Sequence, residues 1–161
     1  MSAVATAFIL SEIDLASLVS AAHPSKRLFR KAIDRFPEFV ASHAQPLPDF
    51  EWSGLLFSTL LVFLEERGIN LLSGSHSAQA EELRDTRQTL LCLIFAQAQR
   101  TTYLAKLEGL STSAAELEEY FEAFTETHEP GVGEALLQGI AYLRVLLAAV
   151  TKERLVVFNV G

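Results

Sequence analysis

The sequence has a single cysteine, Cys92, among 161 residues. One thiol excludes an intramolecular disulfide, and a chain that makes no use of disulfides is typical of the reducing cytoplasm. Cys92 lies in the apolar stretch LLCLIF, where apolar surroundings raise the pKa of a thiol and weaken it as a nucleophile. We therefore expect a cytoplasmic protein in which Cys92 is a small buried hydrophobic residue.

Long apolar runs are also lacking. The longest, from Trp52 to Leu64, has 13 residues, whereas a membrane-spanning helix needs about 20. The apolar stretch at residues 3–10 has no basic residue before it, unlike a secretory signal. The sequence therefore predicts a core helix at Trp52–Leu64, no secretory leader and no membrane span.

Positive charge is scarce, because 13 Lys and Arg stand against 20 Asp and Glu, a net charge of −7. This balance disfavours nucleic acid as a partner and favours a basic one. Five of the cations fall in one predicted amphipathic helix at residues 26–36: Lys26, Arg27, Arg30, Lys31 and Arg35. We interpret them as a solvated face in preference to a surface for anionic membranes, or as a face that meets acidic residues of this chain or of a second copy.

Motifs for catalysis or for metal binding are missing. The four histidines lie in separate segments and never at the i, i+4 spacing of metalloprotease helices: His23, His43, His76 and His128. Neither Gly-x-Ser-x-Gly nor the Glu-x-x-His of carboxylate-bridged metal bundles occurs. We expect a non-enzymatic protein that carries no metal and no cofactor.

Helical periodicity and capping residues are what the sequence does show. They predict six helices, at about residues 11–22, 26–36, 49–67, 78–108, 113–129 and 134–151. Ser113 with Glu116 forms a capping box, and Gly68 marks a left-handed helix end. The segments AVATAFIL and RLVVFNVG, at the two ends of the sequence, are candidates for a short strand pair. The prediction is one all-α domain over residues 1–161, an irregular bundle with or without that strand pair.

Three of the predicted helices are apolar on nearly every side, namely 49–67, the middle of 78–108 and 134–151. Such helices belong in an interior, and one small domain has difficulty covering three of them. The surplus apolar surface predicts either a homodimer or a bundle that hides its helices more fully than the pattern suggests.

A run of acidic residues between residues 116 and 134 contains seven Glu and no Lys or Arg. On a helix, four residues share the core face: Leu117, Tyr120, Phe121 and Phe124. The opposite arc carries Glu118, Glu119, Glu122, Glu126 and Glu129. His128 is expected to turn toward Phe121 and to be half-buried. Repulsion between like charges four residues apart costs about 0.2–0.5 kcal/mol a pair, which a stable domain tolerates.

Two functional hypotheses follow. In the first, the chain is a non-enzymatic acidic interaction protein, of inhibitor, immunity or chaperone type, that binds a basic protein through this Glu stripe. The alternative for these residues is a solvated helix face without a partner.

In the second, it is a small-molecule-binding or sensor domain with a pocket between helices 78–108 and 134–151. Arg144, isolated in an apolar helix, would anchor the ligand unless it pairs with a carboxylate of the fold. The other polar contacts would be Gln97, Arg100 and Tyr103.

Overall fold

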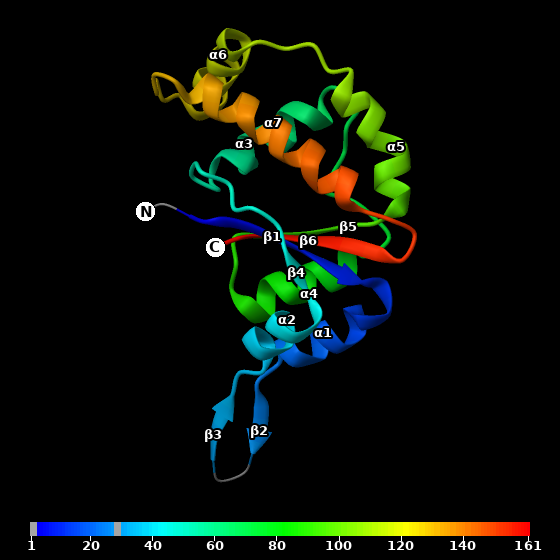
Figure 1. Cartoon of the computed structure of the whole chain (residues 1–161). Coiled ribbons are helices and arrows are strands. Elements are labelled where there is room, and N and C mark those ends of the chain that lie inside the picture. The colour runs from blue at the N-terminus through cyan, green and yellow to red at the C-terminus, as the bar shows by residue number, and fades with distance from the viewer. Residues whose placement is uncertain (1–2, 28–29) are drawn as a thin grey trace.

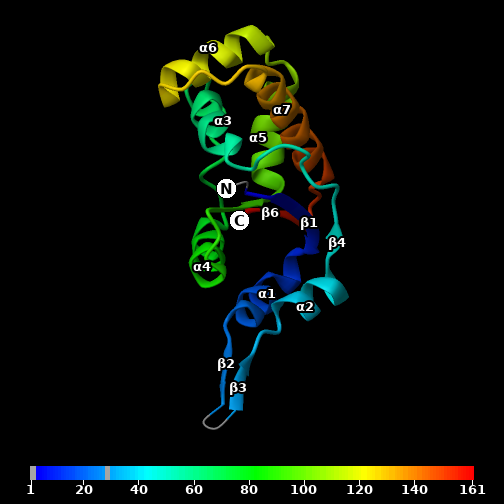
Figure 2. The same cartoon turned by 90° about the vertical axis from the view of Figure 1, so that its left-hand side faces the viewer.

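The fold is built on an antiparallel sheet with helices on both faces (Figures 1 and 2). The computed structural model describes residues 3–27 and 30–161. Its four-stranded sheet has the order β4 (Gln45–Pro46), β1 (Ala5–Ser11), β6 (Arg154–Val160) and β5 (Leu91–Phe95). The predicted all-α class is therefore wrong, and the chain is an α/β protein.

The two segments at the ends of the sequence form the centre of this sheet. β1 and β6 pair antiparallel from Ala5 opposite Val160 to Ser11 opposite Arg154. The strand pair that the sequence left open is therefore present, but it is the centre of a sheet and not an addition to a helical bundle. Because side chains alternate along a strand, Ala7 and Ile9 point into one hydrophobic core while Phe8 points into another.

The stretch LLCLIF is a strand and not the middle of a helix. The helix predicted at 78–108 is divided into α4 (Ser77–Arg87), β5 and α5 (Gln97–Glu108). Gln88 ends α4 in the left-handed conformation, with φ of 54°. Cys92 then faces one core and Leu93 the other. A strand buried on both faces has the same continuous apolar pattern as a buried helix, so periodicity did not separate them.

The corner between β5 and α5 is held by a buried side chain. Gln99 is 5% exposed, and its Oε1 accepts a hydrogen bond from the Ala96 amide at 2.8 Å. Its Nε2 donates to the Ile94 carbonyl at 3.3 Å. The side chain thus satisfies backbone groups where the strand gives way to the helix, as buried polar groups require.

Helices cover the sheet on two sides (Figure 1). α3 (Leu56–Glu65), α5 and α7 (Val132–Ala149) lie over one face, and α6 (Ala114–Thr125) packs against α7 and α3. α1 (Leu15–Ala22), α2 (Phe36–His43) and α4 lie on the other face. The sheet buries the apolar helices that were expected to lack cover, which removes most of the reason for predicting a homodimer. The homodimer itself stays a prediction.

The larger core lies between the sheet and α3 and α7, and aromatic rings fill its centre. The ring of Phe57 meets that of Phe158 edge-on, with centroids 4.8 Å apart. α7 has the length and composition of a membrane span, and half of that window is buried in this fold. The core helix of a folded domain can have the same length and composition and is buried in the same way.

The basic segment predicted as a helix at 26–36 is a projecting hairpin instead. Its strands are β2 (Ser25–Arg27) and β3 (Arg30–Ile33), and residues 28 and 29 lie outside the described residues. α2 begins after it, with Pro37 in its first turn, where the missing amide hydrogen costs nothing. Figure 1 shows the hairpin at the end of the molecule opposite to α6, so the described part of this segment does not meet the Glu residues of α6 in its own chain.

Other helix ends follow the predicted signals in part. Gly68 ends the segment after α3 with φ of +77°, and Ser113 caps α6 by accepting the Glu116 amide at 3.2 Å, as predicted. The first predicted helix opens with a 3-10 turn at Glu12–Asp14 before α1. α3 begins at Leu56 and not at Asp49, because residues 49–55 form an irregular turn that packs along β1.

The close crossing of α6 and α7 depends on Gly133. A Cβ there would overlap the carbonyl oxygen of Ala114 and lie 3.1 Å from Glu118 Cβ. We expect Gly133→Ala to lower the free energy of unfolding by about 1–3 kcal/mol, because the two helices must move apart. Urea denaturation measures this. The control is Gly109→Ala, where φ is −83° and the nearest contact is 3.3 Å, and an equal loss there would contradict the crossing.

Burial of Cys92 also has a measurable consequence. Burial raises the pKa of this thiol from 9.0 to about 12. At pH 8 the folded protein should react with a thiol reagent about a thousandfold more slowly than the urea-unfolded protein, because the thiolate is scarce and covered. The pKa of the thiol is higher in the folded protein than in the unfolded protein, so the unfolded thiol ionises first as the pH rises. The burial of the neutral thiol therefore contributes fully to the free energy of unfolding below pH 9, and this contribution is lost as the pH rises toward 12. Fast labelling of the folded protein would show that the thiol is exposed.

Candidate functional site

The acidic residues predicted to bind a partner lie at one end of the molecule. We call Glu118, Glu119, Glu122, Glu126 and Glu129 the acidic surface. The first three are on α6, whose first turn is held by the Ser113 cap. α6 ends at Thr125, and Glu126 has a left-handed φ of 56°. The predicted stripe along one helix is therefore wrong for Glu126 and Glu129, which lie in the α6–α7 loop.

This loop folds back onto the helix through two carboxylates. Glu118 Oε2 accepts a hydrogen bond from the Gly131 amide at 3.2 Å, and Glu122 Oε2 lies 3.2 Å from His128 Nδ1. His128 is exposed, with 63% of its side chain accessible, and does not turn toward the core as expected. Once the helix ends at Thr125, its periodicity no longer determines where His128 points. The two contacts fix the loop beside α6.

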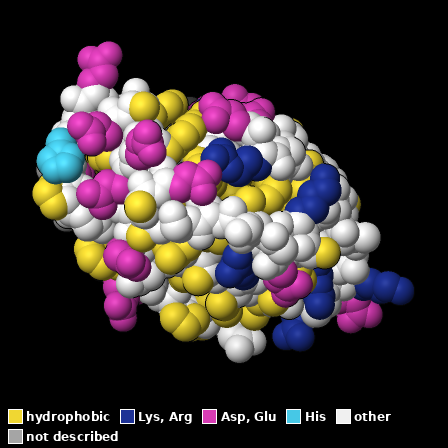
Figure 3. All heavy atoms as spheres, turned by 90° about the horizontal axis from the view of Figure 1, so that it is seen from above, with side chains coloured by type: hydrophobic (Ala, Val, Ile, Leu, Met, Phe, Trp, Pro, Cys, Tyr) yellow, Lys and Arg dark blue, Asp and Glu magenta, His cyan; other side chains and the backbone are white. Residues whose placement is uncertain are grey.

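Cations do not neutralise the acidic surface. Among the residues that the structure describes, no Lys or Arg lies within 4.0 Å of its five carboxylates. The nearby Arg67 pairs with Glu116 instead, at 2.9 Å. Hydrogen bonds from Thr112 and Arg67 lower the pKa of the Glu116 carboxyl. In Figure 3 the acidic side chains gather at this end, while most Lys and Arg in view lie toward the other side.

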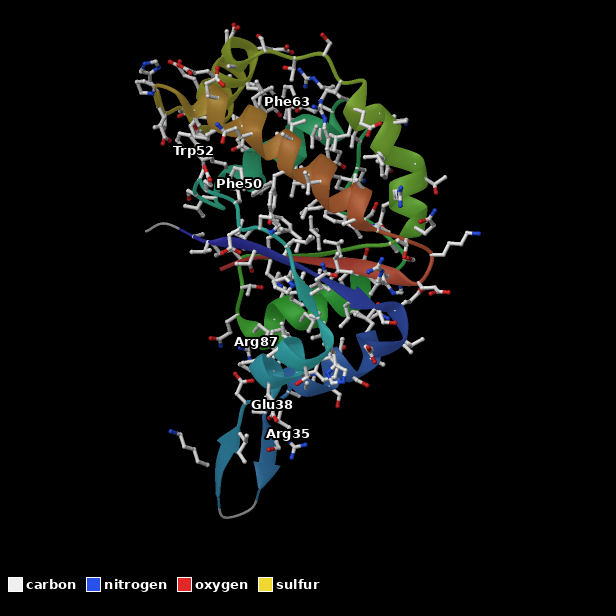
Figure 4. All side chains as sticks on the ribbon, viewed as in Figure 1. Arg35, Glu38, Phe50, Trp52, Phe63 and Arg87 are labelled. Carbon is white, nitrogen blue, oxygen red and sulfur yellow. The ribbon has the colours of Figure 1, made fainter. Side chains whose placement is uncertain are left out.

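Exposed aromatic rings lie beside these acids. Phe124, predicted to face the core, is 50% exposed, whereas Leu117 and Phe121 are buried as predicted. Trp52 is 44% exposed. Its indole N–H donates to Gln138 Oε1 on α7 at 2.8 Å. Figure 4 shows Trp52 just below the α6–α7 loop, whereas Phe63 lies deeper between the helices.

Trp52 was not singled out from the sequence, which placed it within an apolar core run. The signal that could have found it is its position between Glu51 and Ser53, at the polar end of that run. Large aromatic residues held in an exposed position are common anchors of protein interfaces. The acidic surface therefore has an aromatic neighbour that belongs to a different part of the chain.

The residues of the alternative ligand pocket hold α5 against α7. Arg144 Nε donates to the Leu107 carbonyl at 3.0 Å, near the C-terminal end of α5. Arg100 Nη1 donates to the Val150 carbonyl, just beyond the end of α7. Carbonyls at helix C-termini carry partial negative charge, so each arginine satisfies one helix end. Arg144 thus binds a backbone acceptor, where a carboxylate or a ligand was predicted.

The two other residues of that pocket contribute little polar chemistry. Tyr103 is half-buried, with the Lys106 ammonium 5.8 Å from its ring centroid. Gln97 Nε2 lies 3.5 Å from Thr101 Oγ1, at the limit of a hydrogen bond. Two wide hollows, of about 780 and 740 Å³, lie elsewhere, on either side of α2.

The hollow between α1 and α2 contains two histidines, but within the described part of the chain neither of them bonds to a serine of the hollow. Ser42 Oγ donates to the Glu38 carbonyl at 2.8 Å, and His43 Nδ1 lies 3.1 Å from the Phe39 carbonyl oxygen. His23 Nε2 lies 2.7 Å from Glu82. Nucleophilic catalysis needs a base bonded to the nucleophile, and Ser42 and the two imidazoles bond to other partners. Among the described residues, no group of three His, Cys, Asp or Glu side chains is arranged to hold a metal ion.

The arginine between α5 and α7 allows a direct test of its structural role. We expect Arg144→Met to lower the free energy of unfolding by about 1–3 kcal/mol, because the Leu107 carbonyl loses a charged donor in a half-buried place. Chemical denaturation measures the change. Arg154→Met, at an exposed position, is the control and should stay within about 0.5 kcal/mol of the parent. Equal stability of the parent and Arg144→Met would contradict this role.

Comparisons with protein-family models, with curated proteins and with solved structures find no match.

Proposed function

We propose that this chain is an acidic interaction protein that binds a basic protein partner through the acidic surface. The observation that carries the proposal is the convergence of five carboxylates, from α6 and the loop after it, where no described Lys or Arg pairs with them. A role as an inhibitor, an immunity-type protein or a dedicated chaperone would suit such a surface.

The electrostatic argument is one of complementarity. The chain has a net charge of −7, so its field attracts a basic protein before contact is made. Charges at the rim of an interface speed and orient docking more than they add affinity. Glu119 and Glu126 are exposed and make no side-chain ion pair in the described structure, so a partner would not have to break one.

The neighbouring aromatic residues add what charge alone does not supply. Trp52 and Phe124 are about half exposed and lie on the turn before α3 and on α6. Aromatic residues contribute much of the binding energy in protein interfaces when a partner covers them. A surface that combines carboxylates with exposed aromatic rings is better suited to binding a protein than to binding a free metal ion. The alternative small-molecule pocket lacks comparable support, because Arg100 and Arg144 already bond to carbonyls.

Neutralising the exposed acids tests the proposal. Octa-arginine amide serves as a defined basic probe, and its binding is measured by fluorescence anisotropy between 20 and 200 mM salt, roughly the range over which surface charges become screened. We expect the triple variant Glu119→Gln, Glu122→Gln, Glu126→Gln to bind about tenfold more weakly and with a shallower salt dependence. The reason is that exposed charge pairs contribute roughly 0.2–1 kcal/mol each.

The matched control changes three exposed carboxylates elsewhere: Glu38→Gln, Glu108→Gln and Glu153→Gln. This variant has the same net charge as the first, so only the position of the charges differs. Equal affinities for the two variants would show that the probe responds to net charge and not to the acidic surface.

A further inference from the structure

Two arginines of this chain share one arrangement, in which a guanidinium stacks on an aromatic ring and pairs with a carboxylate. Arg67 lies 3.4 Å from the ring centroid of Phe63 and 2.9 Å from Glu116. Arg87 lies 4.5 Å from the ring centroid of Phe36 and 2.8 Å from Asp34. The flat guanidinium meets the ring with its face and the carboxylate with its edge, so both contacts form together.

A third aromatic residue and carboxylate lie together without a cation. Trp52 and Glu129 both line a hollow of about 90 Å³ between the turn before α3 and the α6–α7 loop. The remaining lining residues are uncharged: Ser53, Leu56, Pro130, Gly131, Val132 and Ala135. Tryptophan has the aromatic ring that attracts cations most strongly. The hollow therefore has both partners of the arrangement, while the cation is absent from its lining.

The indole ring of Trp52 and the main chain at Glu129 are held in place before any partner arrives. Gln138 binds the indole N–H of Trp52 at 2.8 Å, which restrains the ring. Glu129 lies in a loop that is fixed at Gly131, whose amide donates to Glu118 at 3.2 Å, and the Val132 amide donates to the Glu129 carbonyl at 3.2 Å. A ring and a main chain that are already ordered lose little conformational entropy when a partner binds.

We propose that Trp52 and Glu129 form a socket for one arginine or lysine side chain of the partner, with arginine preferred. The cation stacks on the indole and pairs with the Glu129 carboxylate, as Arg67 does with Phe63 and Glu116. The inference rests on the proposed function and assigns to it a specific contact, at the edge of the acidic surface. The neighbouring carboxylates orient the basic partner, and the socket selects a side chain that is both flat and charged.

The test uses the chain's own fluorophore, because Trp52 is its only tryptophan. Octa-arginine amide is added to the full chain at low salt, and octa-citrulline amide, whose side chains have nearly the same shape without charge, is the ligand control. We expect octa-arginine to change the Trp52 emission and octa-citrulline to leave it unchanged. The change should reach half its size at the peptide concentration that gives half-maximal binding by anisotropy.

Variants separate the socket from the general acidity. Glu129→Gln should weaken octa-arginine binding by about three- to fivefold, the size of one exposed charge pair, whereas Glu153→Gln, on another part of the surface, should have little effect. Trp52→Leu should weaken binding as Glu129→Gln does, and Trp52→Phe, which keeps a ring, should recover part of the loss. Circular dichroism of each variant checks that it folds.

The outcomes for the socket and for the proposed function differ. If octa-arginine binds to the parent without changing Trp52 emission, and Glu129→Gln matches Glu153→Gln, the socket is wrong while the acidic surface stands. If Trp52→Leu and Trp52→Phe bind as tightly as the parent, the ring makes no contact and the socket is wrong. If octa-arginine does not bind to the parent at low salt, the proposed function fails and the socket fails with it.

Discussion

The pairing of β1 with β6 is the constraint on which the architecture is built. These strands come from opposite ends of the sequence, and their seven-residue ladder forms the middle of the sheet. Each presents apolar side chains to both faces, so neither face can be left in water. Every helix that packs on the sheet therefore depends on a contact between residues about 150 positions apart in the printed sequence.

The acidic surface is placed by the same core, through two further steps. α7 lies over the sheet, and α6 crosses α7 so closely at Gly133 that a methyl group would not fit. The loop between these helices then returns to α6 through Glu118 and to the region of Trp52. The close helix crossing at Gly133 and the hydrogen bond from Gly131 to Glu118 thus extend the order of the core to a polar surface, where they position the main chain of separate segments.

Among the described residues, four arginines bond to groups other than the carboxylates of the acidic surface. Arg100 and Arg144 satisfy helix ends inside the α5–α7 contact. Arg67 and Arg87 lie over aromatic rings with carboxylate partners. Arginine suits both tasks, since its planar fork donates in fixed directions while its face packs on rings. These four arginines bond within the fold, and other cations belong to the β2–β3 hairpin at the opposite end of the molecule from α6. The end that carries α6 therefore has an excess of negative charge.

Local signals in the sequence determined the Ser113 cap, the left-handed Gly68 and the interior position of Cys92, because each depends on nearby residues or on apolar content alone. They named the two terminal segments as candidate strands but left open whether these strands form. They also identified α6 and its first acidic residues. Only the tertiary structure decided that LLCLIF is a strand, because burial on both sides erases the periodicity that tells strand from helix. It also decided that Glu129 lies beside Trp52, since no local pattern relates residues that meet only after α6 has packed on α7.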